Sequence, residues 1–157
     1  MTVTVSVVLP VHNRSSSLAY SCQSVLSQSF REIELIVVDD ASSEDLEPIV
    51  DALEDPRVRF IRRETNGGAG AARNTGIAAA RAPMIAFHDS DDMWLPGKLE
   101  RQVALLNEMP PEVGVVTGPK ILYGKNSAGQ YGPGLVSCTP TPGRQITLEE
   151  DQVRRTF

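Results

Sequence analysis

Short apolar runs, each followed directly by polar residues, do most to limit how this chain can fold. Residues 5–11 (VSVVLPV) and 34–39 (ELIVVD) are nearly continuous in apolar side chains, which is typical of strands buried on both faces of a sheet. Between them, Leu18, Cys22 and Val25 recur at helical spacing. Strands that alternate with helices in this way predict an α/β fold, with a mostly parallel sheet and helices on both of its faces.

The same criteria predict further elements along the first part of the chain. Further strands are predicted at residues 58–61, 84–87 and 113–117, and helices after residues 15–17, around residues 49–53, at residues 71–81 and at residues 99–106. Residues 66–70 (NGGAG) are expected to form a loop, because glycine favours neither helix nor strand.

The character of the sequence changes after Pro119. Residues 124–143 are rich in Gly, Pro, Ser and Thr, which indicates a long loop or an irregular hairpin. Thr147 and Glu150 have the spacing of a capping box, which starts a helix. We therefore expect a domain of residues 1–120, followed by an incomplete region of residues 121–157.

Composition excludes several classes of protein. The 157 residues are enough for one domain, and 41% hydrophobic residues are enough for a packed core. A net charge of −5 argues against a nucleic-acid partner, because such proteins usually need a basic face. No apolar run reaches the ~18–20 residues of a membrane span, and no signal peptide is expected before the first strand. Cys22 and Cys138 form no framework or metal motif, and Cys22 is expected to be a buried free thiol. The expected location is cytoplasmic, including a peripheral position at the inner face of the membrane.

Polar clusters follow three of the predicted strands at the point where each strand ends. They are HNR at residues 12–14, DD at residues 39–40 and HDSDD at residues 88–92. In open parallel sheets, ligands bind beyond the carboxyl ends of the strands. We therefore expect the three clusters to converge on one rim of the sheet.

The acidic cluster has two interpretations. Asp89, Asp91 and Asp92 repel one another, so they need a cation, hydrogen-bond donors or bulk water. Hard cations such as Mg²⁺ and Mn²⁺ prefer carboxylate and phosphate oxygens, and a metal here would neutralise charge on a departing nucleotide. The alternative is a solvated acidic turn that caps the following helix. The position after a buried strand favours a ligand site.

The neighbouring residues also have two interpretations each. His88 either contacts a ligand or is a structural histidine, and Trp94 either stacks on a sugar or base or packs under the following helix; for both, the structural role is favoured. Asp39 and Asp40 fit a base or ribose contact as well as they fit a simple turn or cap.

Residues 66–74 (NGGAGAARN) combine backbone N–H groups with Arg73 near a predicted helix start. Phosphate oxygens suit both groups, although Arg73 pairing with an acid of the rim is an equally realistic role. A dinucleotide fingerprint is disfavoured, because Arg73 stands where that motif needs Gly or Ala.

Taken together, these segments resemble the family 2 glycosyltransferases, which have the GT-A fold. The matching segments, in the order and with the spacing of the family, are VSVVLPVHNR, SVLSQSF, ELIVVDDASSED, NGGAGAARNTGIAAARAPMIAFHDSDD and WLPGKLERQV. The resemblance covers roughly residues 3–120, and it covers the remainder more loosely.

The resemblance implies a role for particular residues of the rim. Pro10, His12 and Arg14 would line the nucleotide pocket after the first strand. Asp40 would face the nucleobase, and Arg73 would lie close to the base or the phosphates.

Further roles implied by the resemblance belong to the acidic cluster. Asp89 and Asp91 match the DxD motif of the family, so Asp91 would be the direct metal ligand. Asp89 would contact ribose or metal-bound water, Ser90 would lie in the same nucleotide-sugar pocket, and Asp92 would support them. The implied cofactor is Mn²⁺ or Mg²⁺, and the implied donor is a nucleotide-activated sugar, most often a UDP-sugar.

One departure from the family concerns catalysis. Inverting members carry an acidic general base well beyond the DxD motif, and we expect it beyond Phe157, together with the acceptor-binding half. Glu149, Glu150 and Asp151 come too early to match it. The predicted function is therefore the donor-binding part of an enzyme that transfers a sugar to a glycan, lipid-linked or other hydroxyl acceptor. A non-catalytic nucleotide-sugar-binding module is the alternative, and a sugar nucleotidyltransferase is disfavoured because PVHNR replaces its glycine- and lysine/arginine-rich loop.

Overall fold

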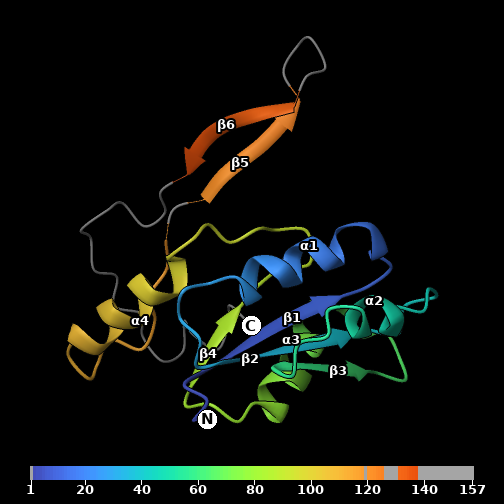
Figure 1. Cartoon of the computed structure of the whole chain (residues 1–157), viewed down its shortest axis with the longest axis horizontal. Helices are drawn as coiled ribbons and strands as arrows, with labels where there is room; N and C mark the ends of the chain where they lie inside the picture. Colours follow the sequence, from blue (N-terminus) through green and yellow to red (C-terminus); the bar gives the residue numbers. More distant parts are fainter. Residues whose placement is uncertain (1, 119, 126–130, 138–157) are drawn as a thin grey trace. The chain divides into compact units, whose positions relative to one another are not determined.

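The computed structural model of the chain describes residues 2–118, 120–125 and 131–137. The chain divides into two compact units, Met1–Glu100 and Arg101–Phe157, which we describe separately (Figure 1). The predicted boundary at residue 120 was drawn from composition and motifs, whereas this division reflects packing. No helix among the described residues is long and apolar enough to cross a membrane.

The first unit is built on a four-stranded sheet in which every neighbouring pair of strands is parallel. The strands lie in the order β3-β2-β1-β4, so the two apolar runs form the central pair. The strands are β1 (Val5–Val11), β2 (Ile33–Asp39), β3 (Val58–Arg62) and β4 (Met84–Phe87). Every residue of β1 and β2 is buried, which confirms the prediction that these runs are covered on both faces.

Helices cover both faces of this sheet, as predicted. They are α1 (Ser15–Leu26), α2 (Glu47–Asp51) and α3 (Gly68–Ala79). Connections between parallel strands are almost always right-handed. The connections through α1 and α2 run from β1 towards β3, and the connection through α3 runs back across β1 to β4. α1 and α2 therefore pack on one face and α3 packs on the other (Figure 1).

The direction of the connections reverses between β1 and β4, which makes this pair the switch point of the sheet. Ligands of open parallel sheets bind beyond the strand ends at such a point. Residues 12–14 follow β1, and residues 88–92 follow β4. The fold thus brings two of the three polar clusters to the switch point, although about 75 residues separate them in the sequence.

Pro10 lies inside β1 and is buried, so it does not belong to the loop after the strand. Proline has no N–H group and is normally excluded from central strands. Here β4 pairs with β1 only as far as Val8, and the Val8 carbonyl accepts the last bond on that side, from His88. Pro10 lies two residues further along, beyond the paired part of β4, so the N–H group that proline lacks has no described strand to bond to on that side.

Three predicted elements differ from the structure. The helix predicted after residues 15–17 begins at Ser15, so these serines lie inside α1. The helix predicted at residues 71–81 begins at Gly68, because Asp40 accepts hydrogen bonds from the N–H groups at its start. The strand predicted at residues 113–117 is not formed, and these residues are irregular. Val115 is exposed. An apolar run becomes a strand only when a neighbouring strand pairs with it, and no described strand does so here.

The helix α4 (Lys98–Glu108) begins in the first unit and continues into the second. The second unit also contains β5 (Lys120–Lys125) and β6 (Tyr131–Ser137), which form an antiparallel pair with a register irregularity between Ile121 and Tyr123. This agrees with the predicted irregular hairpin. The helix predicted from Thr147 lies outside the described residues.

Candidate functional site at the rim of the sheet

The polar clusters do converge, as the sequence predicts. We use the term rim for residues 12–14, 40–43, 66–68 and 88–92, which follow the carboxyl ends of the four strands. Side chains of the rim contact one another across long stretches of sequence. The Arg14 guanidinium lies 2.5 Å from the Asp91 carboxylate, and Asn13 bonds to Ser42 and Ser43.

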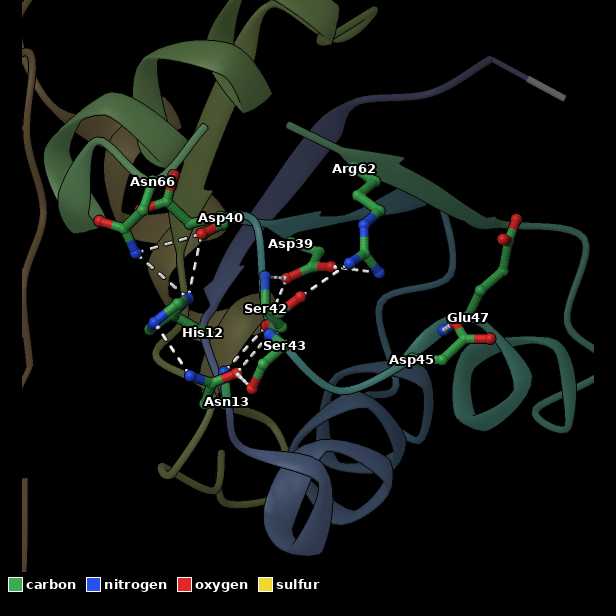
Figure 2. A network of polar contacts seen from close by, with 10 residues as sticks. All are labelled: His12, Asn13, Asp39, Asp40, Ser42, Ser43, Asp45, Glu47, Arg62 and Asn66. Atoms are coloured by element: carbon green, nitrogen blue, oxygen red, sulfur yellow. Dashed lines mark hydrogen bonds and ion pairs between the residues drawn. The ribbon is translucent and has the colours of Figure 1, made fainter. Parts of the chain in front are cut away.

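Asn13 joins the loop after β1 to the loop after β2 (Figure 2). Its backbone N–H donates to Ser42 Oγ at 2.8 Å, and its side-chain oxygen accepts from the Ser43 N–H at 2.7 Å. Asn13 has a φ of 47°, in the left-handed region that asparagine tolerates better than most residues. The sequence reasoning missed this residue, and the asparagine after the first strand was the available signal.

His12 lies beside the same junction and is exposed. Its Nδ1 atom is 3.0 Å from the Asp40 carbonyl oxygen and 3.2 Å from the side-chain nitrogen of Asn66 (Figure 2). The loops after β1, β2 and β3 therefore meet around this ring. An exposed imidazole held in place by its neighbours is suited to contact a bound ligand.

Asp39 has a structural role. Its carboxylate accepts from the Ser42 N–H at 2.9 Å and from Ser42 Oγ at 2.5 Å. Its other oxygen pairs with Arg62 at 3.2 Å (Figure 2). The residue is fully buried, so of the two interpretations left open by the sequence, the turn-forming one describes this structure.

Asp40 is also directed into the protein, although the resemblance places it against a nucleobase. The residue is 2% exposed, and its carboxylate accepts from the Gly67 and Gly68 N–H groups and pairs with Arg63. Burial alone would raise the pKa of Asp40, but these hydrogen bonds and the Arg63 guanidinium outweigh it and lower the pKa. The charge lies at the N-terminus of α3, where a helix favours an anion.

This arrangement changes the interpretation of the glycine-rich segment. Two of the N–H groups that were expected to suit a phosphate are already used by Asp40. Gly68 has a φ of 81°, which side chains rarely adopt, so a glycine is required for the chain to present both groups to one carboxylate. Arg63, which completes the interaction, was not singled out from the sequence.

The acidic residues of the DxD match remain accessible. The side chains of Asp89 and Asp91 are 44% and 52% exposed. Asp89 pairs with Arg73 at 2.6 Å, and Asp91 pairs with Arg14 at 2.5 Å. The pairing of Arg73 with an acid of the rim, which the sequence left open beside a phosphate contact, is present in the structure. These pairs bring four of the predicted site residues to the switch point, two of each charge.

Three residues of this region are buried, namely His88, Ser90 and Trp94. His88 Nε2 lies 3.2 Å from the Ser21 carbonyl oxygen, and its ring centroid is 4.9 Å from that of Trp94. Burial lowers the pKa of His88 to about 4. Trp94 is 8% exposed, and the Lys98 ammonium lies 4.2 Å from its ring centre. Ser90 is buried too, and its carbonyl accepts a bond from Ser17. The burial of His88 and Trp94 favours the structural interpretation of both, although among the described residues no hydrogen-bond partner reaches His88 Nδ1.

The fold and the rim define an α/β domain of the class that binds a ligand at the switch point of its sheet. The sequence matches the family model described as Glycosyl transferase family 2 over residues 6–147. The chain therefore belongs to glycosyl transferase family 2, and the resemblance noted from its motifs is confirmed.

Curated relatives support this assignment. The chain is 38% identical over 102 residues to the UDP-Glc:alpha-D-GlcNAc-diphosphoundecaprenol beta-1,3-glucosyltransferase WfgD of Escherichia coli, a match that covers 65% of this chain and 40% of WfgD. It is 40% identical over 99 residues to the succinoglycan biosynthesis protein ExoO of Rhizobium meliloti, which covers 63% of this chain and 28% of ExoO. The chain thus spans well under half the length of these relatives.

Solved structures identify the fold as GT-A. Residues 1–349 of S. aureus TarS in complex with UDP-GlcNAc match with a TM-score of 0.62 and 30% identity, over 67% of this chain and 31% of that one. The mannosyltransferase PcManGT from Pyrobaculum calidifontis, in complex with GDP-Man and Mn²⁺, matches with a TM-score of 0.65 and 23% identity, over 73% of this chain and 34% of that one. The predicted fold class is confirmed.

Proposed function

We propose that this chain is the donor-binding part of a glycosyltransferase that moves a sugar from a nucleotide diphosphate, such as UDP, to a hydroxyl acceptor with inversion at the sugar. The observation that carries the proposal is the pairing of Asp89 and Asp91 with two arginines at the switch point of a family 2 sheet. The relatives support the substrate class, because WfgD is named for UDP-Glc and TarS was solved with UDP-GlcNAc.

A divalent cation fits the residues available. Mg²⁺ sites usually take one or two carboxylates from the protein, together with phosphate oxygens and water. Asp89 and Asp91 supply two accessible carboxylates on the same loop. Within the residues that the structure describes, no group of three or more potential ligands gathers at one point, so the nucleotide and water would complete the coordination. Bound there, Mn²⁺ or Mg²⁺ would stabilise negative charge on the leaving diphosphate.

The arginines have a second role in this proposal. Arg14 and Arg73 neutralise the two carboxylates, and guanidinium groups bind phosphate oxygens well. The side chains of both ion pairs are partly exposed to solvent, between 30% and 52%, so solvent weakens each pair and lowers the cost of rearranging it. We propose that the two guanidinium groups turn to the diphosphate when the donor binds, which leaves the carboxylates free for the cation.

The remaining rim residues would shape the nucleotide pocket. His12 is exposed beside Asp40 and Asn66, where it can contact the base or ribose. Asp40 would act through the loop it holds rather than through its saturated carboxylate. We place the general base and the acceptor site in the part of the relatives that this chain does not cover. For a lipid-linked acceptor, the protein would work at the cytoplasmic face of a membrane.

Isothermal calorimetry with UDP tests the proposal, first with Mn²⁺ and then with EDTA. We expect binding in Mn²⁺ to be at least ~10-fold tighter, because the cation bridges carboxylate and diphosphate. Uridine, which lacks the diphosphate, is the control and should bind equally in both buffers. Equal affinity for UDP with and without Mn²⁺ would remove the metal from the proposal. No UDP binding in either buffer would remove the donor site.

A further inference from the structure

A row of polar side chains lies along one side of α1 and its C-terminal turn, and the proposed function leaves it unexplained. We use the term polar row for Ser17, Ser21, Ser24 and Gln28, which are spaced so that they share one helix face. Ser21, Ser24 and Gln28 are buried. Burying a polar group costs free energy unless it finds a hydrogen-bond partner, so the partners of this row indicate what it does.

The first half of the polar row bonds to the segment that carries the DxD match. Ser17 Oγ donates to the Ser90 carbonyl at 2.7 Å. Ser21 Oγ donates to the Asp92 carbonyl at 2.8 Å. These carbonyls belong to the residues on either side of Asp91.

The second half of the polar row, Ser24 and Gln28, bonds to the next residues of the same segment. The Trp94 N–H donates to Ser24 Oγ at 3.1 Å. The Gln28 side chain donates to the Leu95 carbonyl at 3.0 Å and accepts from the Leu99 N–H at 3.2 Å. Leu99 lies in the first turn of α4, where N–H groups lack partners within the helix.

The hydrogen bonds follow the same order along the polar row and along the segment from Ser90 to Leu99. Residues 88–97, which we call the acidic loop, contain no helix or strand, so their backbone groups depend on partners elsewhere. Burial alternates along the start of the loop: His88 and Ser90 are buried against α1, whereas Asp89 and Asp91 are accessible. A slip of one residue would bury Asp89 and Asp91 and expose His88 and Ser90.

We infer that the polar row is a positioning element, which sets the register of the acidic loop so that Asp89 and Asp91 both face the rim. None of its members is placed at the ligand. They act on the metal and the nucleotide only through the loop, so the binding part of this inference rests on the proposed function. Partners that hold a metal ligand in place typically matter by about 10–100-fold in metal affinity.

The test uses the single tryptophan of the chain. Trp94 lies in the acidic loop and is buried, so acrylamide quenching of its fluorescence reports the position of the loop without any ligand. We expect Ser24→Ala to raise the quenching constant at least ~2-fold, because it removes the acceptor of the Trp94 N–H. Ser16→Ala is the matched control, since Ser16 lies on α1 with an exposed side chain.

The second measurement is Mn²⁺-dependent UDP binding. We expect Ser17→Ala to weaken it about 10-fold, Ser17→Thr to restore it because the hydroxyl donor returns, and Ser16→Ala to leave it unchanged. Far-UV circular dichroism and thermal unfolding show whether each variant keeps its fold. Wild-type-like binding by Ser17→Ala, or an equal loss in Ser16→Ala, would overturn the inference.

The two proposals fail separately. If the wild-type protein binds neither Mn²⁺ nor UDP, the proposed function is wrong, and the quenching measurement still decides whether the polar row holds the acidic loop. Unchanged quenching in Ser24→Ala would overturn the anchoring itself.

Discussion

Carboxylates of similar sequence context have opposite uses at the rim. Asp39 and Asp40 end an apolar strand and are buried, with every strong partner supplied by the chain. Asp89 and Asp91 also follow an apolar strand, yet their side chains are accessible and each forms an ion pair with one arginine. Buried and bonded carboxylates hold loops together, whereas accessible ones remain available to a ligand.

At Asp91, we predict that Asp91→Asn weakens Mn²⁺-dependent UDP binding more than Asp92→Asn does. Asp91 matches the coordinating position of the family, and an amide replaces its charge. The accompanying loss of the exposed ion pair with Arg14 should cost little. An effect on metal affinity beyond the typical 10–100-fold of a supporting residue is expected at Asp91 alone. Parallel Mn²⁺ titrations of the two variants check this, and a larger loss in Asp92→Asn would contradict it.

At His88, we predict a loss of stability on the acid side of neutrality. Burial lowers the pKa of His88 to about 4, whereas an unfolded histidine has a pKa of about 6.5. The unfolded chain therefore binds more protons between these values, and stability falls as the pH drops through this window. Linkage gives a loss of about 2 kcal/mol between pH 8 and pH 5.

Urea unfolding followed by Trp94 fluorescence at both pH values measures the loss at His88. His88→Gln should remove most of the difference, and His12→Gln, at an exposed position, should retain it. Carboxylates with lowered pKa values, such as Asp40, contribute only at lower pH, because their stabilisation is lost below the unfolded pKa of about 4. Equal urea midpoints for the wild-type protein at pH 8 and pH 5 would contradict the prediction.

Among the elements, the packing of α3 on β1 depends on one glycine. A Cβ atom at Gly76 would lie 2.3 Å from a methyl group of Val8, and Val8 is fully buried in the central strand. We predict that Gly76→Ala destabilises the protein by about 1–3 kcal/mol through overpacking. Gly70→Ala on the same helix has open space and should stabilise it by about 0.5–1 kcal/mol. Thermal unfolding of both variants is the measurement, and stabilisation by Gly76→Ala as well as by Gly70→Ala would show that helix propensity decides instead.

The elements also show where sequence patterns suffice. Apolar continuity predicted β1 and β2, because central parallel strands need apolar side chains on both faces. Shorter apolar runs predicted the edge strands β3 and β4. The start of α3 was misplaced because its first N–H groups are satisfied by Asp40, which lies 28 residues earlier than Gly68. The prediction of a strand at residues 113–117 was wrong for a related reason. A strand needs a neighbouring strand to pair with, and the apolar pattern of one segment does not show whether that neighbour exists.

The candidate site, like the fold, was predictable only in part from the sequence. Strand ends marked the rim, and the Asp89–Ser90–Asp91 spacing marked the acidic cluster. The roles of Asn13, Ser42 and Arg63 were not predictable, since each depends on a partner from another loop. The role of the polar row was not predictable either. A serine on a helix is expected to be solvated unless the segment that packs against it is known.

For the whole molecule, we predict that residues 1–157 bind donor but do not catalyse acceptor-dependent transfer. A general base typically contributes about 10²–10⁴-fold, and orientation of the acceptor adds to this. Among the accessible carboxylates of the rim, Asp89 and Asp91 are assigned to the donor side, and Asp92 is assigned to their support. UDP release from UDP-Glc and UDP-GlcNAc, with and without a panel of hydroxyl acceptors, is the measurement. Water alone should release UDP slowly, and a marked increase with any acceptor would place the base within this chain.

The strand order has a consequence for how the domain is made. β1 finds its first neighbour, β2, soon after synthesis, but its other edge stays unpaired until β4 emerges some 75 residues later. Contacts between distant segments form slowly, because loop closure must come first. An unpaired central edge invites association with other chains in the meantime. We therefore expect β4 to join the sheet last, and the acidic loop to reach its final position only after β4 has paired with β1.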